Sequence, residues 1–319
     1  MDFKQKYLKY KFKYLQLKNK KNLSQDKIGY DKCIPTISTE REISNCDRLI
    51  YKVSSNIKFS KYDVITENEL ETIKYSDHKM IISKFLYNQE KYDIYSWNMN
   101  DFDKKYNDGY KELLNSHISN YFKKNPIDSK YLIFSFQESI KNSLFIKTLI
   151  EFLQKSNMHL IKHIIFNTII EINYDVQLLL FSTDIRTQVK DFGKKRHMIT
   201  NNIINTVKSI AGTKSYVYLN INDLMIVGTH FPINTHSIDL GNNLRKIAFN
   251  KLKEEFKANK NLIIIGDLNF RNLNNVDQLN TLLKDTGNFA EPNKLKQPTC
   301  KFNHCELTCD NIMCKEELK

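Results

Sequence analysis

Apolar and polar residues alternate along the chain in two patterns, one typical of strands and one typical of helices. The uninterrupted apolar run at 262–265 is typical of a strand that is buried on both faces. Apolar residues at helical spacing over 243–256 predict an amphipathic helix. Further strands are expected at 45–53, 80–85, 92–97, 131–136, 176–181, 216–221 and 224–228, and further helices at 110–122, 143–153 and 278–284. This alternation predicts a two-sheet α/β sandwich.

Polar residues of catalytic type follow several of these strands. Asp267 and Asn269 come directly after the run at 262–265. A carboxylate accepts a proton or holds a hard cation, and an amide orients a water molecule. The corresponding residues at the ends or starts of other predicted strands are Asn98, Gln137, Glu138, His230, Asp77 and His78. Because ligands bind at strand ends in α/β sheets, we expect one site at the rim of the sandwich.

The net charge is strongly positive. Lys and Arg number 49 against 36 Asp and Glu, which gives a formal net charge of +13. This excess suits a polyanion and does not choose among nucleic acid, an inositol phosphate and an acidic membrane surface. Residues 1–30 are rich in Lys, with Tyr and Phe interleaved at helical spacing. We expect them to be a helical or disordered leader, with a basic arm for nucleic acid or an anionic surface as the alternative, and residues 31–319 to form one domain.

Cysteine content and hydropathy bear on the compartment. The chain has six cysteines, no signal-peptide pattern and no apolar run of about 18 residues. We therefore expect reduced thiols, a cytoplasmic location and no transmembrane segment. Four of the cysteines lie near the C-terminus, but they lack the paired Cys-x-x-Cys of structural zinc sites.

Five short motifs resemble those of the endonuclease/exonuclease/phosphatase superfamily, the DNase I-like metal-dependent phosphoesterases. They are Trp-Asn at 97–98, Gln-Glu at 137–138, Thr-His at 229–230, Gly-Asp-Leu-Asn at 266–269 and Ser-Asp-His at 76–78. Four longer segments resemble the inositol polyphosphate 5-phosphatase branch: GDLNFR at 266–271, GTKS at 212–215, PTCKFN at 298–303 and REISNCDRLIYK at 41–52. The Lys/Tyr-rich opening resembles leaders of giant-virus (mimivirus-like) proteins, which would place the protein in the host cytoplasm or the virion.

The order of these motifs departs from that of the family. The segments at 46–52 and 76–78 close the family's domain, whereas here they precede the Trp-Asn motif that opens it. The resemblance therefore implies a four-layer DNase I-like sandwich that is circularly permuted, with a short linker at 86–91 joining neighbouring strands. The competing interpretation is that residues 1–90 form a separate piece. A second, degraded copy of the CDRLIYK segment at 308–315 leaves Asp310 as an alternative to Asp47.

The resemblance also implies roles for individual residues. Mg²⁺ is the expected cofactor, with Glu138 and Asn98 as its ligands. Asp267 would deprotonate the attacking water with help from Asn269, and His78 would face the phosphate. Asp47 would fix the tautomer of His78. Asp77 would join the same network, and His230 would donate to a phosphate oxygen. The candidates for binding further phosphates are Arg271, Lys214, Lys301 and Arg41.

Three functions follow from these patterns. The first is a Mg²⁺-dependent phosphatase acting on inositol phosphates or phosphoinositide headgroups. The second is a nuclease or abasic-site endonuclease on the same fold, which the net charge suits. The third is a catalytically inactive nucleic-acid-binding protein, which a wide separation between His78 and Asp267 would favour. The sequence does not indicate the oligomeric state.

Overall fold

The chain divides into two compact units. The computed structural model describes residues 36–37, 42–44, 46–76, 78–100, 110–167, 173–197, 214–231, 238–270, 272–273, 276–292, 295, 299–302 and 305–306. The smaller unit comprises Met1–Arg41 and Asn303–Lys319, and the larger unit is Glu42–Phe302. In the smaller unit, β1 (Thr36–Ile37) pairs antiparallel with β18 (Cys305–Glu306). The predicted leader at 1–30 lies outside the described residues.

Two six-stranded sheets build the larger unit. The order of sheet I is β4-β5-β6-β7-β9-β8, and the order of sheet II is β10-β11-β12-β13-β3-β16. Both sheets are mixed, because β6–β7 and β12–β13 are parallel while the other pairs are antiparallel. Sheet I contains β4 (Lys58–Val64), β5 (Ile81–Tyr87), β6 (Glu90–Asn98), β7 (Tyr131–Ile140), β8 (His159–Asn167) and β9 (Asn173–Ser182). Sheet II contains β3 (Asp47–Lys52), β10 (Asp191–Arg196), β11 (Ser215–Ile221), β12 (Leu224–His230), β13 (Asn261–Asp267) and β16 (Phe289–Ala290).

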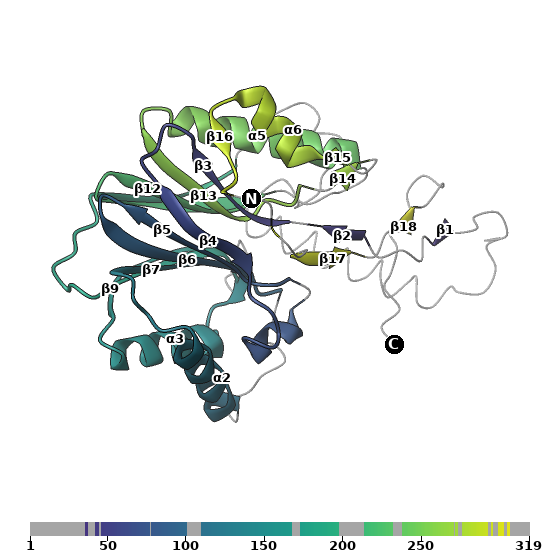
Figure 1. Cartoon of the computed structure of the whole chain (residues 1–319). Coiled ribbons are helices and arrows are strands. Elements are labelled where there is room, and N and C mark those ends of the chain that lie inside the picture. Colours follow the sequence, from purple (N-terminus) through teal and green to yellow (C-terminus); the bar gives the residue numbers. More distant parts are fainter. Residues whose placement is uncertain are drawn as a thin grey trace, which may run out of the picture. The chain divides into compact units, whose positions relative to one another are not determined.

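Helices cover the outer faces of both sheets (Figure 1). The helices are α2 (Lys111–Lys124), α3 (Leu144–Lys155), α5 (Ile238–Glu255) and α6 (Gln278–Thr286), with the 3-10 helix η1 at Glu71–Tyr75. One hydrophobic core lies between the sheets, a second lies between sheet I and α2–α3, and a third lies between sheet II and α5–α6. Three cores separating four layers confirm the predicted four-layer α/β sandwich.

Two further short pairs complete the larger unit. β2 (Glu42–Ser44) pairs antiparallel with β17 (Cys300–Phe302), and β14 (Asn272–Leu273) pairs with β15 (Val276–Asp277). No helix among the described residues is long and apolar enough to cross a membrane.

Helix and turn boundaries follow local chemistry. The Ser143 hydroxyl caps α3 by accepting a hydrogen bond from the backbone N–H of Ile146. The Asp277 carboxylate caps α6, and Gly287 ends it in the left-handed conformation. β5 and β6 are joined by a two-residue turn, Asn88 and Gln89, both with positive φ, as tight hairpins require.

The two sheets approach closely below one end of the sandwich. A Cβ on Gly228 of β12 would lie 2.7 Å from Oγ of Ser135 on β7. Glycine is therefore required here for a steric reason, since any side chain would push the facing strands apart. Both residues lie two positions before the polar strand ends described below.

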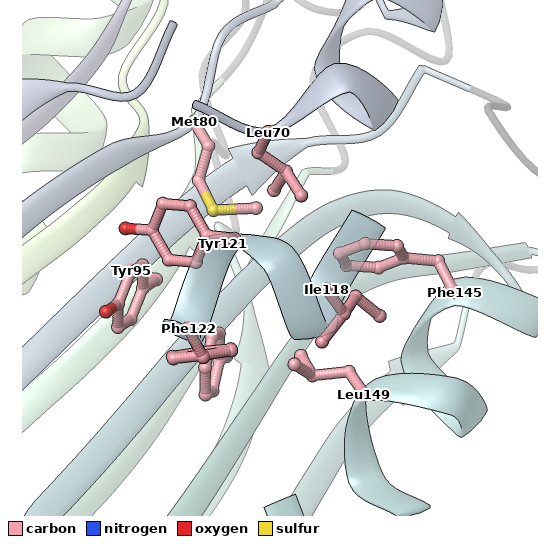
Figure 2. Close-up of a pocket in the computed structure, with 9 residues that line it drawn as sticks. Leu70, Met80, Tyr95, Ile118, Tyr121, Phe122, Phe145 and Leu149 are labelled. Carbon is pink, nitrogen blue, oxygen red and sulfur yellow. The ribbon is translucent and has the colours of Figure 1, made fainter. Parts of the chain in front are cut away.

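The core between sheet I and its helices is apolar and almost completely filled. Figure 2 shows residues from β6, α2 and α3 around one small cavity of about 10 Å³. The side chains that line it include Tyr95, Ile118, Tyr121, Phe122 and Leu149. This volume is about one water-sized sphere, and apolar lining keeps such a space dry. The cavity is a packing defect, too small for a ligand.

Candidate active site

Strand register brings the polar strand ends of both sheets to one rim. In sheet II, β3 and β12 flank β13, so Asp47 and His230 both lie opposite Asp267. In sheet I, Asn98 at the end of β6 lies opposite Gln137 on β7. The Asn98 amide donates a hydrogen bond of 2.9 Å to Oδ2 of Asp267, which joins the two sheets at this rim.

Asp47 and His78 form a buried pair. Oδ2 of Asp47 lies 2.7 Å from Nδ1 of His78, and both side chains are almost fully buried. Burial raises the pKa of the Asp47 carboxyl to about 6, while the neighbouring His78 acts to lower it. The Thr299 hydroxyl accepts a hydrogen bond of 3.0 Å from the backbone N–H of Asp47. A carboxylate bonded to Nδ1 leaves Nε2 as the nitrogen available to a substrate.

The backbone around His78 is anchored to β6. The Ser76 hydroxyl donates to the carbonyl oxygen of Asn98 at 2.8 Å and accepts from the N–H of His78 at 3.1 Å. The indole N–H of Trp97 donates to the carbonyl oxygen of His78 at 3.0 Å. These bonds fix the imidazole relative to the end of β6, a chain segment twenty residues further on in sequence.

Asp267 lies at the centre of this half of the site. Its Oδ1 accepts a hydrogen bond of 2.9 Å from the N–H of Asn269. Ligand atoms of Asp47, His78 and Asp267 all lie within 4.8 Å of one another, so these three residues could hold a metal ion. The wide separation of His78 from Asp267 that would favour an inactive protein is therefore contradicted.

His230 anchors the other half of the site. Its Nδ1 lies 2.9 Å from Oδ1 of Asp175, and its Nε2 lies 3.4 Å from Glu138 and 3.6 Å from Asp267. Nε2 is buried and makes no hydrogen bond within the described part of the chain. Lys214 completes the cluster, with its ammonium 3.1 Å from Oε1 of Glu138 and 3.7 Å from Oδ1 of Asp175.

The ionisation of this half follows from these contacts. Burial disfavours the charged form of Asp175, but His230, Lys214 and a hydrogen bond from Ser215 outweigh it and lower its pKa to about 2. Burial likewise opposes the charge of Glu138, yet Lys214 and His230 lower the pKa of that carboxyl. The same carboxylates raise the pKa of Lys214 against the effect of its burial. Two carboxylates and an ammonium are therefore charged at neutral pH.

Three residues at this rim have a positive φ. Glu138 and Asn269 adopt positive φ values of 51° and 53°, which is uncommon for residues with a side chain. Gly266 has a φ of 145°, and a Cβ there would collide with the carbonyl oxygen of Thr229 on the neighbouring strand. Such outliers persist only where the surrounding structure holds them, and they cluster at functional sites.

The structure brings most of the sequence-predicted residues together. Those that meet at the rim are Asp47, His78, Asn98, Glu138, Lys214, His230, Asp267 and Asn269. Asp77, Arg271, Arg41 and the alternative Asp310 lie outside the described residues. Lys301 lies in β17, opposite Ile43 of β2.

Sequence reasoning missed Asp175 and Thr299. Asp175 lies near the start of β9 (NYDVQLLLFS), just before the segment at 176–181 from which the strand was predicted, so no local signal marked it as a site residue. Thr299 belongs to the PTCKFN segment at 298–303, in which Lys301 was singled out from the sequence and the hydroxyl of Thr299 was not. Cys46, next to Asp47, is disulfide-bonded, so the prediction of reduced thiols is wrong for this residue. Spacing along a sequence does not reveal which cysteines meet in space.

Comparison with solved structures gives matches of low identity. The endonuclease/exonuclease/phosphatase from Bacteroides vulgatus is 14% identical with a TM-score of 0.39, over 60% of this chain and 70% of that chain. TDP2 from C. elegans is 19% identical with a TM-score of 0.34, over 56% of this chain and 48% of its own, so the match spans about half of that protein. The 3′ phosphatase NExo from Neisseria, bound to a product DNA hairpin, is 12% identical with a TM-score of 0.33. No family model and no curated protein matches this sequence.

Proposed function

We propose that the protein is a metal-dependent phosphoesterase. The observation that carries this proposal is the convergence of ionised carboxylates, two carboxylate-paired imidazoles and one ammonium at the rim where the sheets meet. Hydrolysis of a phosphate ester needs charge neutralisation, an aligned water and stabilisation of the leaving group. This rim offers residues for each requirement.

The donor set at the rim suits a hard divalent cation. We propose that Glu138 and Asn98 hold Mg²⁺, because both offer oxygen donors and the lowered pKa keeps Glu138 charged. Asp47 and His78 are hydrogen-bonded to each other, so the group of Asp47, His78 and Asp267 is a less suitable metal site. When bound, the cation would neutralise charge on the phosphoryl oxygens and polarise the scissile bond.

The remaining residues would move or donate protons. Asp267 would take the proton of the attacking water, with its carboxylate held by Asn98 and by the N–H of Asn269. His78 would donate from Nε2 to a phosphoryl oxygen, since Asp47 occupies its Nδ1. His230 would donate from Nε2, which is buried, makes no hydrogen bond among the described residues and lies 3.4 Å from Glu138 and 3.6 Å from Asp267.

The preferred substrate class is an inositol phosphate or a phosphoinositide headgroup. The support is the resemblance of GDLNFR, GTKS and PTCKFN to the 5-phosphatase branch, which contribute Arg271, Lys214 and Lys301 as binders of further phosphates. Lys214 contacts Glu138 and Asp175 and is therefore within reach of a phosphate at the rim. Arg41 remains a candidate from the sequence.

Phosphate release tests the proposal. A malachite-green assay with a soluble inositol polyphosphate in Mg²⁺ should show release by the native protein and at least about 100-fold less by Asp267→Ala. Asp223→Asn is the matched control, because among the described residues this exposed carboxylate pairs with Lys190, and asparagine tolerates the positive φ of this turn residue. Equal release by the native protein and Asp267→Ala would end the idea.

A second candidate is a nuclease or abasic-site endonuclease. It uses the same rim residues, and unpaired cations beside the rim favour it, as described in the next subsection. Cleavage of an abasic duplex or a plasmid in Mg²⁺, lost in His78→Ala, would select it. Cleavage that persists in that variant would exclude this rim as its source.

We also propose that the chain is a circular permutation of the family's domain. Support comes from β5 and β6, which are antiparallel neighbours joined by only Asn88 and Gln89. If the natural ends of the family lie here, fragments 1–88 and 89–319 should reassemble when expressed together and should recover activity. Failure of soluble fragments to associate would count against a permutation at this turn. The giant-virus resemblance of the leader remains the support for a location in the host cytoplasm or virion.

A further inference from the structure

Two edge strands, one from each sheet, carry cations and aromatic rings that face each other. β8 is the outer strand of sheet I, and β10 is the outer strand of sheet II. The Lys162 ammonium on β8 lies 3.2 Å from the centre of the Phe192 ring on β10. The Arg196 guanidinium on β10 lies 5.6 Å from the centre of the Phe166 ring on β8. Lys194 shares the face of β10 with Phe192, since residues two apart in a strand point the same way. We call these five residues the cation edge.

The charges of the cation edge are not neutralised by neighbours. None of its three cations forms an ion pair within the part of the chain that the structure describes. By contrast, Lys195 on the opposite face of β10 lies 2.6 Å from Glu255. Lys190, just before β10, lies 2.8 Å from Asp223. Lys190 and Lys195 are thus paired with carboxylates, whereas the three cations of the cation edge keep their charge available.

The aromatic contacts orient these cations without cancelling their charge. A ring attracts a cation through its quadrupole, so the net positive charge remains, whereas a carboxylate would remove it. Phe192 is 49% exposed, so part of its ring is accessible to a ligand. An exposed ring beside unpaired cations is the combination with which proteins hold single-stranded nucleic acid, by base stacking and phosphate contacts.

The cation edge begins beside the candidate active site. Arg196 lies opposite Ser215 on β11, near the end of β12 that carries His230. Two strand spacings, about 10 Å, separate β10 from β12. Phe192 lies four residues from Arg196, about 13 Å further along the strand and away from the rim. A ligand that occupies both places must be long and must carry charge along its length.

We propose that the cation edge binds a single strand of nucleic acid and leads it to the rim. A free inositol phosphate is too short to reach Phe192 from the site. A membrane is a plane, and a stripe that runs from the rim down the side of the sandwich does not lie in the plane of the rim. A nucleic-acid strand bends over such an edge and offers one phosphate per nucleotide. This inference favours the second candidate, a nuclease, over the inositol phosphate as the substrate class of the proposed phosphoesterase. It rests on the proposed function only for cleavage, not for binding.

Binding measured without catalysis tests the inference. Fluorescence anisotropy of a labelled single-stranded oligonucleotide of about 16 nucleotides is recorded with the full chain in EDTA, from about 50 to about 200 mM salt. Lys162→Gln/Lys194→Gln/Arg196→Gln should lower the affinity at least about tenfold. It should also reduce the slope of log affinity against log salt by about 2, because each phosphate contact to a single strand contributes about 0.7. Phe192→Ala should weaken binding with an unchanged slope.

The matched control removes the same formal charge from paired positions. Lys130→Gln/Lys190→Gln/Lys195→Gln neutralises three cations that lie within 2.8 Å of carboxylates, and it should leave affinity and slope near native. Thermal unfolding and circular dichroism establish that each variant is folded. Equal loss in both triple variants, or a native slope in the cation-edge variant, overturns the inference. Binding to phosphatidylserine vesicles without binding to the oligonucleotide overturns it in favour of a membrane. If the protein binds the strand but, in Mg²⁺, neither cleaves it nor releases phosphate from an inositol polyphosphate, the proposed function alone is refuted.

Discussion

The buried contact between Asp175 and His230 supports the sharpest prediction. Asp175→Asn keeps the shape of the side chain but removes the charge that faces Nδ1 of His230 at 2.9 Å. A hydrogen bond to a charged group contributes about 1.5–3 kcal/mol. If His230 donates a proton in the transition state, kcat should fall between about tenfold and about 100-fold.

The same substitution should destabilise the fold by a predictable amount. The pKa of Asp175 is about 2, against an ordinary value of 3.8, so its charge contributes about 2 kcal/mol to folding at neutral pH. Because the folded-state pKa is depressed, this stability is present above pH 3.8 and is lost as the pH falls through about 2. The free energy of unfolding in urea at neutral pH, compared with that of the native protein, measures this contribution.

The control is Asp184, an aspartate that lies two residues after the end of β9, the strand that contains Asp175. In the described part of the chain the Asp184 carboxylate pairs with the exposed Arg186, so Asp184→Asn should leave both kcat and stability near native. Steady-state release of nitrophenol from p-nitrophenyl phosphate or its bis-ester in Mg²⁺ provides kcat. A folded Asp175→Asn protein with native kcat would refute the role of the Asp175–His230 contact.

Three further outcomes are expected. Gly266→Ala should cost more than about 3 kcal/mol of stability in urea and abolish phosphoester turnover, because its Cβ has no space beside the carbonyl oxygen of Thr229; a native midpoint would contradict this. Burial lowers the pKa of His197 to about 3, so the unfolded chain binds the extra proton between pH 6.5 and 3. This group should therefore remove up to about 1.4 kcal/mol of stability per pH unit as the pH falls through that window, and His197→Gln should flatten the slope. EDTA should abolish phosphoester hydrolysis, with recovery on addition of excess Mg²⁺, and hydrolysis that survives chelation would exclude a metal-dependent reaction.

Buried strands were predictable from the sequence because they consist of uninterrupted apolar residues. The runs in β12 and β13 are of this kind, and the run in β7 is interrupted by Ser135 alone; their positions agree with the structure. β8 and β10 were not predicted, because strands at the edge of a sheet carry polar residues on faces exposed to water. β10 in particular reads DFGKKR, a sequence with no apolar alternation.

Some site residues were likewise predictable from the sequence and others were not. Asp267 and Glu138 were predicted because each belongs to a motif that follows an apolar run; Asp267 ends β13, whereas β7 continues past Glu138 to Ile140. Asp175 escaped because it lies within β9 and gains its partner, His230, only when the two sheets pack together. The pairing of Asp47 with His78 came from resemblance, since nothing in the local sequence shows that residues 31 positions apart share a hydrogen bond.

The glycine at 228 has a consequence for engineering. It allows β12 and β7 to pack closely two residues before the site groups that the two sheets contribute, so the spacing of those groups depends on the volume of the side chains packed here. A substitution such as Gly228→Ala would act as a wedge that shifts one half of the chemistry against the other. The rate of the reaction could therefore be raised or lowered by substitutions at this position between the sheets, without changing any residue that contacts the substrate.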